Sequence, residues 1–150
     1  MKLTSPAFGH KERIPEKYTC HGENISPPLK IADVPPGAKA LVLIMEDPDV
    51  PRTLREDGMW DHWILFNMPP ELTDIAEGEE PPGHHGAGTA GNTDYYGPCP
   101  PDAEHRYFFK LFALDSKLNL PERASKRDVM EAMSGHVMDS AELIGLYAPK

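Results

Sequence analysis

The 150-residue chain is predicted to be mainly β, a sandwich of antiparallel sheets with one peripheral helix near the C-terminus. Sixteen of its 17 prolines lie at or before Pro121. Because proline removes a backbone donor and restrains the preceding residue, no long helix fits in that part. The apolar segments between the prolines have the length of strands. Frequency alone also predicts about one cis bond among so many prolines.

Five segments favour strands because apolar residues, many of them β-branched or aromatic, are bounded by turn residues. The last expected strand alternates between two sets of apolar residues, which is typical of a strand with one face in a core and the other largely covered. The expected strands lie near Leu3–Ala7, Leu29–Ala32, Ala38–Glu46, His62–Met68 and His105–Leu114.

The pattern changes after Pro121. Ser125 is followed three residues later by an aspartate, which indicates a helix start, and Gly135 is a suitable stop. We expect a helix of roughly three turns between them, with Met130 and Met133 in the core. The segment Ala141–Ala148 favours a final strand, although its first half is also compatible with a helix.

Length and charge limit the classes of function. Residues 1–150 have the size of one domain, either monomeric or homodimeric. The net charge of -9 repels nucleic acid and anionic membrane surfaces. The longest apolar runs, Ala40–Met45 and Trp63–Phe66, are too short for a transmembrane segment. The N-terminal residues also lack the apolar core of a signal peptide, so we expect a cytoplasmic protein.

Cysteine usage leaves one question open. Cys20 and Cys99 are too few for a disulfide scaffold in a chain that can bury a core. They are either free thiols or one bridge, because sequence spacing does not distinguish these states.

Three segments place polar side chains at the ends of expected strands. Asp47 and Asp49 follow a hydrophobic run, His62 lies between two tryptophans, and His105 and Tyr107 follow a Gly/Pro turn. Together they supply acids, imidazoles and a phenol for one small pocket. Each also has a simpler interpretation: a turn held by the aspartates, packed histidines and a rigid loop.

Other polar or aromatic residues receive structural interpretations. His84 and His85 lie in the glycine-rich loop Gly83–Asn92 and are expected to be solvated. Trp60 and Trp63 are expected in the core or in a pocket wall.

Five ordered motifs resemble the phosphatidylethanolamine-binding protein family, in its bacterial and archaeal branch that is often called Raf kinase inhibitor-like. The resemblance covers most of the chain. One departure is visible at 102–104, where this chain has DAE and family members commonly carry a glycine. The motifs are YTCHGENISPPL (18–29), DPDVP (47–51), DHWILFNMP (61–69), GTAGNTDYYGPCPP (88–101) and HRYFFKLFALD (105–115).

The resemblance implies a β-sandwich with a small anion pocket that binds phosphate-like or acetate-like ions and phosphorylated head groups. It implies no enzymatic turnover, and we expect no metal and no cofactor. Carried over residue by residue, the implied ligand-binding residues are Asp47, Asp49, His62, Gly97, Pro98, His105 and Tyr107.

The chemistry of such a pocket follows from its side chains. His62, His105, the Tyr107 hydroxyl and amides near Gly97 can donate to an anion. An aspartate that accepts from an imidazole would set its tautomer and favour its charged form. An aspartate that pairs with the ammonium of an ethanolamine head group is the alternative role.

Two other classes of function compete with the binding module. The runner-up is a protein inhibitor of a kinase or a serine protease. A metal-dependent hydrolase using Asp47, Asp49, His62 and His105 ranks lower, because no metal-ligand spacing supports it. A nucleophilic enzyme is weaker still, since no strand-to-helix turn presents Cys20, Cys99 or Ser26.

Overall fold

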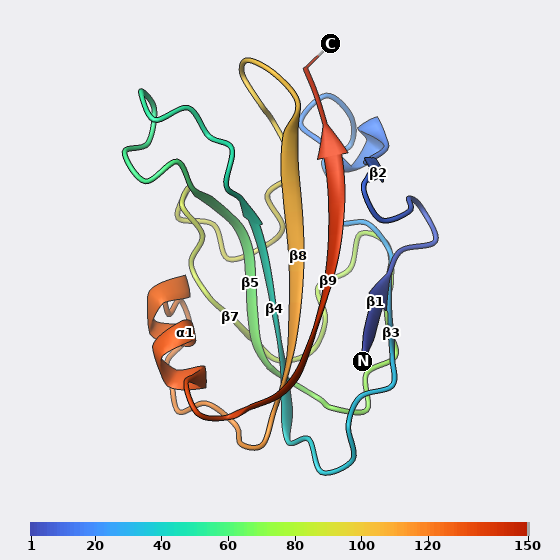
Figure 1. Ribbon diagram of the computed structural model, residues 1–150, viewed down its shortest axis with the longest axis vertical. Helices are drawn as coiled ribbons and strands as arrows, with labels where there is room; N and C mark the ends of the chain where they lie inside the picture. Colours follow the sequence, from blue (N-terminus) through green and yellow to red (C-terminus); the bar gives the residue numbers. More distant parts are fainter. Residues whose placement is uncertain (150) are drawn as a thin grey trace.

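The computed structural model describes residues 1–149 as two β-sheets with one short 3-10 helix and one α-helix (Figure 1). The larger sheet has the strand order β2-β9-β8-β4-β5-β7, and the smaller has the order β1-β3-β6. The elements are β1 (Lys2–Thr4), β2 (Glu12–Arg13), η1 (Glu16–Tyr18), β3 (Leu29–Ala32), β4 (Ala40–Asp47), β5 (Trp60–Met68), β6 (Asp74–Ile75), β7 (His84–His85), β8 (His105–Leu114), α1 (Lys126–Met133) and β9 (Val137–Tyr147).

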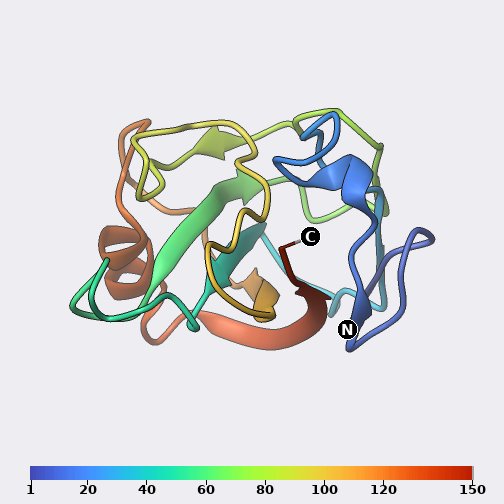
Figure 2. The same cartoon turned by 90° about the horizontal axis from the view of Figure 1, so that it is seen from above.

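The larger sheet separates two hydrophobic layers. Figures 1 and 2 show β1 and β3 on one face of this sheet and α1 beside the other. In β4, Leu41 and Leu43 belong to the core shared with the smaller sheet, whereas Val42 and Ile44 belong to the core under α1. Side chains of a strand point alternately to its two faces, so β4 is buried on both. The mainly β sandwich with a peripheral helix is therefore confirmed.

The predicted strands agree with the observed ones in place, and three short strands were not predicted. These are β2, which pairs in parallel with β9, together with β6 and β7. The final strand starts at Val137, so the first half of the expected segment Ala141–Ala148 is strand rather than helix. Within residues 1–149 no peptide bond is cis, contrary to the expectation from proline frequency.

Helix α1 begins where the sequence indicates but is shorter. The Ser125 hydroxyl accepts from the Asp128 amide, and the Asp128 side chain returns a bond to the Ser125 amide. The helix covers 8 residues, about two turns. Met133 is buried, but Met130 is 45% exposed, so the prediction that both methionines lie in the core was wrong for Met130.

The strand register explains why distant motifs meet. In the antiparallel pairs, Asp47 lies opposite Trp60 on β5, and Glu46 lies opposite Phe108 on β8. The end of β4 and the starts of β5 and β8 therefore lie at the same end of the sheet. This register places Asp47, His62 and His105 close together although up to 58 positions separate them in the chain.

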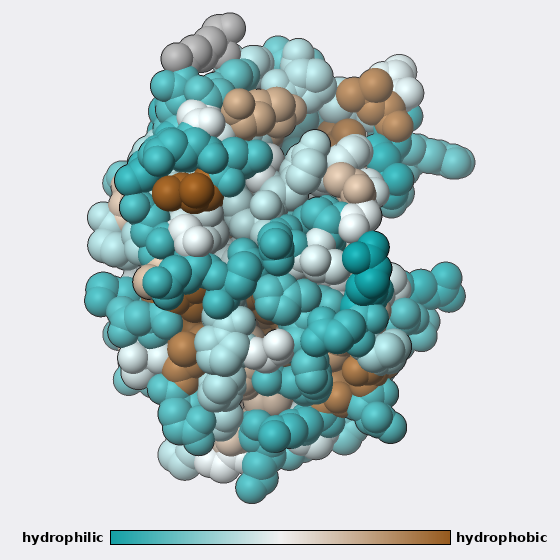
Figure 3. Space-filling view, turned by 180° about the vertical axis from the view of Figure 1, so that it is seen from behind, coloured by the Kyte–Doolittle hydropathy of each residue, from teal (hydrophilic) through white to brown (hydrophobic). Residues whose placement is uncertain are grey.

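The surface of the described residues is mostly polar. In Figure 3, hydrophobic residues on one face form small separate groups among hydrophilic ones. Within residues 1–149, no helix is long and apolar enough to cross a bilayer. The large hydrophobic side chains that are exposed are Leu54, Tyr96, Met130, Val137 and Met138.

Candidate ligand-binding site

A cavity of about 210 Å³ lies at this end of the larger sheet. Three of the predicted site residues line it: Asp47, His62 and His105. Gly97, Pro98, Asp49 and Tyr107 do not line it. The complete lining consists of Asp47, Val50, Leu54, Trp60, His62, Tyr96, Cys99, Pro100, Pro101 and His105.

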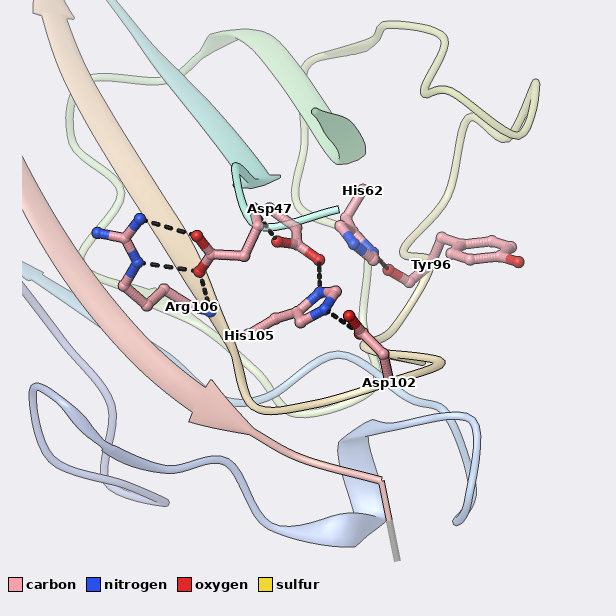
Figure 4. A network of polar contacts seen from close by, with 7 residues as sticks. Asp47, His62, Tyr96, Asp102, His105 and Arg106 are labelled. Carbon is pink, nitrogen blue, oxygen red and sulfur yellow. Dashed lines mark hydrogen bonds and ion pairs between the residues drawn. The ribbon is translucent and has the colours of Figure 1, made fainter. Parts of the chain in front are cut away.

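His105 is held between two carboxylates (Figure 4). Its Nδ1 lies 2.6 Å from Oδ2 of Asp47, and its Nε2 lies 2.7 Å from Oδ1 of Asp102. A carboxylate oxygen accepts, so each ring nitrogen must donate, and a neutral imidazole carries only one N–H. His105 is therefore an imidazolium.

The charge of His105 agrees with its surroundings. Burial by itself would lower the pKa of His105, but the hydrogen bonds to Asp47 and Asp102 outweigh burial and raise this pKa above its ordinary value. The predicted pairing of an aspartate with an imidazole is present between Asp47 and His105, but the other ring nitrogen, which was expected to donate to a ligand, donates to Asp102.

Asp47 also closes a local turn. Its Oδ1 accepts from the Asp49 amide at 2.8 Å, while its Oδ2 accepts from His105. The turn interpretation and the pocket interpretation of the DPD motif therefore both apply to Asp47.

His62 has the opposite protonation state. Its Nδ1 lies 2.6 Å from the carbonyl oxygen of Tyr96, which can only accept, so Nδ1 carries the proton. Burial lowers the pKa of His62 to about 4, so the ring is neutral near neutral pH and its Nε2 is an acceptor. In this state Nε2 of His62 can accept a hydrogen bond in the cavity, whereas His62 was expected from the sequence to donate one.

Two polar groups beside these rings have no hydrogen-bond partner among residues 1–149. They are the indole Nε1–H of Trp60 and the hydroxyl of Tyr107; both atoms are buried from solvent, although Trp60 lines the cavity with another part of its side chain. The Tyr107 ring is fully buried and meets the His62 ring edge-on, with 5.4 Å between centroids. Burial and the nearby Asp47 charge raise the pKa of Tyr107, so the hydroxyl keeps its proton. Tyr107 thus packs against the rings of His62 and His105 without lining the cavity itself.

Asp49 is committed to a different partner. Its carboxylate accepts from Arg106 Nε at 2.9 Å and from Arg106 Nη2 at 2.8 Å, and it also accepts from the Arg106 amide. These bonds lower the pKa of Asp49 and connect the loop after β4 to the start of β8. Asp49 therefore braces the two strands that carry Asp47 and His105.

Gly97 and Pro98 position a wall of the cavity. The Gly97 amide donates to Asn24 Oδ1 at 3.0 Å, and a Cβ atom at position 97 would collide with that oxygen and with the Tyr18 carbonyl. The Pro98 carbonyl accepts from the Cys20 amide. The Gly97 amide is thus already paired and is not a free donor for a ligand.

The question left open for the cysteines is settled by the structure. Cys20 and Cys99 form a disulfide, which ties the loop after η1 to the wall that contains Pro100 and Pro101.

The proposed metal ligands of the hydrolase alternative do not form one ligand group. In the described part of the chain, two sets of three donor side chains lie close enough to hold an ion: Cys20, His21 and Cys99, and Glu80, His85 and Asp94. The first set includes the disulfide. Neither includes Asp47, Asp49, His62 or His105.

Comparison with known proteins identifies the family. The family model described as "Phosphatidylethanolamine-binding protein" matches residues 4–148. The chain belongs to this family. One relative, a UPF0098 protein of Chlamydia trachomatis, is 52% identical to this chain over 147 residues, which cover 98% of each chain. A UPF0098 protein of Methanothermobacter thermautotrophicus is 50% identical, again with 98% of each chain covered.

Solved structures show the same fold. A phosphatidylethanolamine-binding protein homologue from Chlamydia trachomatis superimposes with a TM-score of 0.97 at 50% identity, covering 99% of this chain and 97% of that one. YbcL from Escherichia coli, described as a member of the mammalian PEBP family, has a TM-score of 0.88 at 27% identity, with 99% and 98% covered.

Three residues at the site of this chain were not predicted from the sequence to have a role there. Tyr96 sets the His62 tautomer through its carbonyl, which no side-chain pattern reveals. Arg106 pairs with Asp49, and its place directly after His105 was the only signal. Asp102 was noted as a departure at the pocket rim, but its bond to His105 was not foreseen.

Proposed function

We propose that this chain binds a small oxyanion or a phosphorylated head group in the cavity and does not turn it over. The observation that carries the proposal is the His105 imidazolium, held by buried Asp47 in the wall of an otherwise largely apolar cavity. In such surroundings the effective dielectric is low, so the imidazolium N–H is a strong donor to a small anion, although the carboxylates of Asp47 and Asp102 give the three side chains together a net negative charge.

The protonation states narrow the ligand class. His105 donates, whereas Nε2 of His62 accepts. The best match is therefore an oxyanion that still carries one proton, such as the monoanion of phosphate or of a phosphate monoester. Its P–O–H group would donate to His62, while another of its oxygens accepts from His105.

Binding without turnover agrees with the hydrogen bonds that the two carboxylates of the DPD motif already make. Asp47 bonds to His105 and Asp49 bonds to Arg106, so neither carboxylate is free to act as a general base. The alternative, inhibition of a kinase or a serine protease, gains no support from the cavity geometry. Whether the protein acts in the cytoplasm remains a prediction.

Calorimetric titration with phosphate and sulfate tests the proposal. The two ions have the same shape, but at about pH 5.5 phosphate is chiefly a monoanion with an O–H group and sulfate has none. We expect 1:1 binding of phosphate and much weaker binding of sulfate, because a buried acceptor on His62 would be left unpaired. Equal affinities would contradict the proposed role of His62, and no binding of phosphate would contradict the proposed function.

Two variants assign the binding to this cavity. His62→Asn removes the Nε2 acceptor and keeps a donor for the Tyr96 carbonyl, so we expect roughly tenfold weaker phosphate binding. His84→Gln changes an exposed histidine on β7 and serves as the matched control, with unchanged affinity. Loss of affinity in both variants would place the ion elsewhere.

A further inference from the structure

The carboxylate of Asp102 accepts a hydrogen bond from Nε2 of His105, the ring nitrogen that is not bonded to Asp47. Asp102 extends toward the ring from the loop that precedes β8 (Figure 4). The Asp102 side chain is 50% exposed, whereas the His105 ring is 2% exposed. Within residues 1–149, His105 is its only side-chain partner.

A bound oxyanion would need the same hydrogen atom. The Nδ1–H of His105 is committed to Asp47, so the Nε2–H is the one N–H that the ring can offer a ligand. One N–H makes one strong, well-aligned hydrogen bond. The oxygen of a ligand and the oxygen of Asp102 therefore compete for it, and the Asp102 carboxylate has the chemistry of an acetate ion.

We propose that Asp102 is a specificity-determining residue that acts as an internal anion, so that an oxyanion reaches Nε2 of His105 only by displacing the Asp102 carboxylate. This inference rests on the proposed function. It assigns to this side chain control over which anions bind and how tightly.

The two carboxylates on His105 differ in how easily they can leave. Asp47 is buried and accepts from both the Asp49 amide and His105, so its departure would leave buried groups without partners. Asp102 can rotate into water, where its charge is solvated. Displacement by a ligand therefore affects Asp102 and leaves the Asp47–His105 pair in place.

The size of the effect on anion affinity depends on the fraction of molecules in which Asp102 is not bonded to His105. If Asp102 leaves His105 about one tenth of the time, the apparent affinity for an anion is about tenfold lower than the intrinsic affinity. Asp102→Ala removes the competitor altogether. Asp102→Asn keeps an accepting oxygen without the charge and should give an intermediate affinity.

The test is calorimetric titration of inorganic phosphate into the wild-type protein, Asp102→Ala, Asp102→Asn and the control Glu104→Gln. Glu104 is exposed in the same loop, and its substitution removes an equal charge two residues away. We expect Asp102→Ala to bind phosphate about tenfold more tightly than wild type, and Glu104→Gln to differ by less than about twofold.

Each other outcome overturns the inference. Equal or weaker binding by Asp102→Ala, with phosphate still bound by wild type, would show that Asp102 does not compete. An equal gain in Glu104→Gln would assign the effect to overall charge. If neither wild type nor any variant binds phosphate, the proposed function fails and the inference fails with it.

Discussion

Asp47 and His105 form a hydrogen-bonded ion pair, with 2.6 Å between Oδ2 and Nδ1, whose side chains are only 4% and 2% exposed. The pair joins the last residue of β4 to the first residue of β8. Because β4 and β8 are neighbours in the sheet, the two charges are fixed by backbone register rather than by a mobile loop. The positive charge of the His105 ring therefore depends on Asp47.

Substituting Asp47→Asn should lower both the pKa of His105 and the stability of the fold. The variant removes the buried negative charge that favours the imidazolium. We expect a loss of about 3 kcal/mol in the free energy of unfolding near neutral pH, as for breaking other buried pairs. Nitrogen-15 NMR of the histidine rings and urea unfolding measure the two effects.

Asp49→Asn is the matched control for that variant. It removes an equal charge two residues away, but its partner is Arg106, and this pair is partly exposed to solvent, with Arg106 at 53% and Asp49 at 27%. We expect less than about 1 kcal/mol of destabilisation and a much smaller change in the pKa of His105. An equal effect of both variants on His105 would show that the Asp47 contact is not the cause.

His62 should make stability depend on pH in the acid range. Its pKa is about 4 in the folded protein, below the ordinary value of 6.5, so the unfolded chain takes up the proton first as the pH falls. The stabilisation is present above about pH 6.5 and is lost as the pH falls toward 4, by about 2 kcal/mol at about pH 4.5.

His62→Asn isolates this contribution, because asparagine keeps a donor for the Tyr96 carbonyl but does not titrate. Urea unfolding at about pH 7 and at about pH 4.5 should show a smaller stability loss in the variant than in wild type. Equal losses would mean that His62 is protonated in the folded protein as easily as in the unfolded chain.

Tyr107→Phe should leave the stability of the fold unchanged or raise it. The Tyr107 hydroxyl is buried without a partner in the described structure, so its removal relieves an unsatisfied group. We expect the free energy of unfolding to stay equal or to rise by about 1 kcal/mol. Thermal and urea unfolding provide the check, and a large loss of stability would show that the hydroxyl has a structural partner.

The Cys20–Cys99 disulfide should stabilise the protein and its cavity wall. It closes a loop across a sequence separation of 79. From loop-closure entropy, we expect the double variant Cys20→Ser, Cys99→Ser to lose about 4 kcal/mol in the free energy of unfolding. Urea unfolding of the oxidised wild type and of the variant, which lacks the bridge, measures the difference. An unchanged midpoint would contradict this role.

The same bond bears on location. Disulfides are rare in reducing cytosol, so the predicted cytoplasmic location requires that the two thiols be free in the cell. Trapping free thiols in intact cells, followed by mass spectrometry, distinguishes the two states. A fully oxidised pair in the cell would contradict a reducing compartment.

The strands and the family were predictable because the signals are local. Prolines bound β3 and β4, and alternation marks β8, so these elements follow from neighbouring residues. The short strands β2 and β6 carry only two residues each, too few for any periodic signal.

The site residues were predictable as types but not in their roles. His62 was expected to donate, but its tautomer is set by a backbone carbonyl 34 positions away. Asp49 was grouped with Asp47, but adjacent turn residues point to different partners, His105 and Arg106. Roles of this kind depend on three-dimensional contacts that spacing does not encode.

The central claim is that an oxyanion binds between His105 and His62, in the cavity that Trp60 also lines. The most direct measurement is an NMR titration of nitrogen-15-labelled protein with inorganic phosphate at about pH 5.5, following the ring nitrogens of the histidines and the indole Nε1–H of the tryptophans. We predict saturable 1:1 shifts at His105, His62 and Trp60, with His84 and Trp63 unchanged, since Trp63 already donates to Glu80. Shifts confined to other residues, or no shift up to millimolar phosphate, would contradict the account.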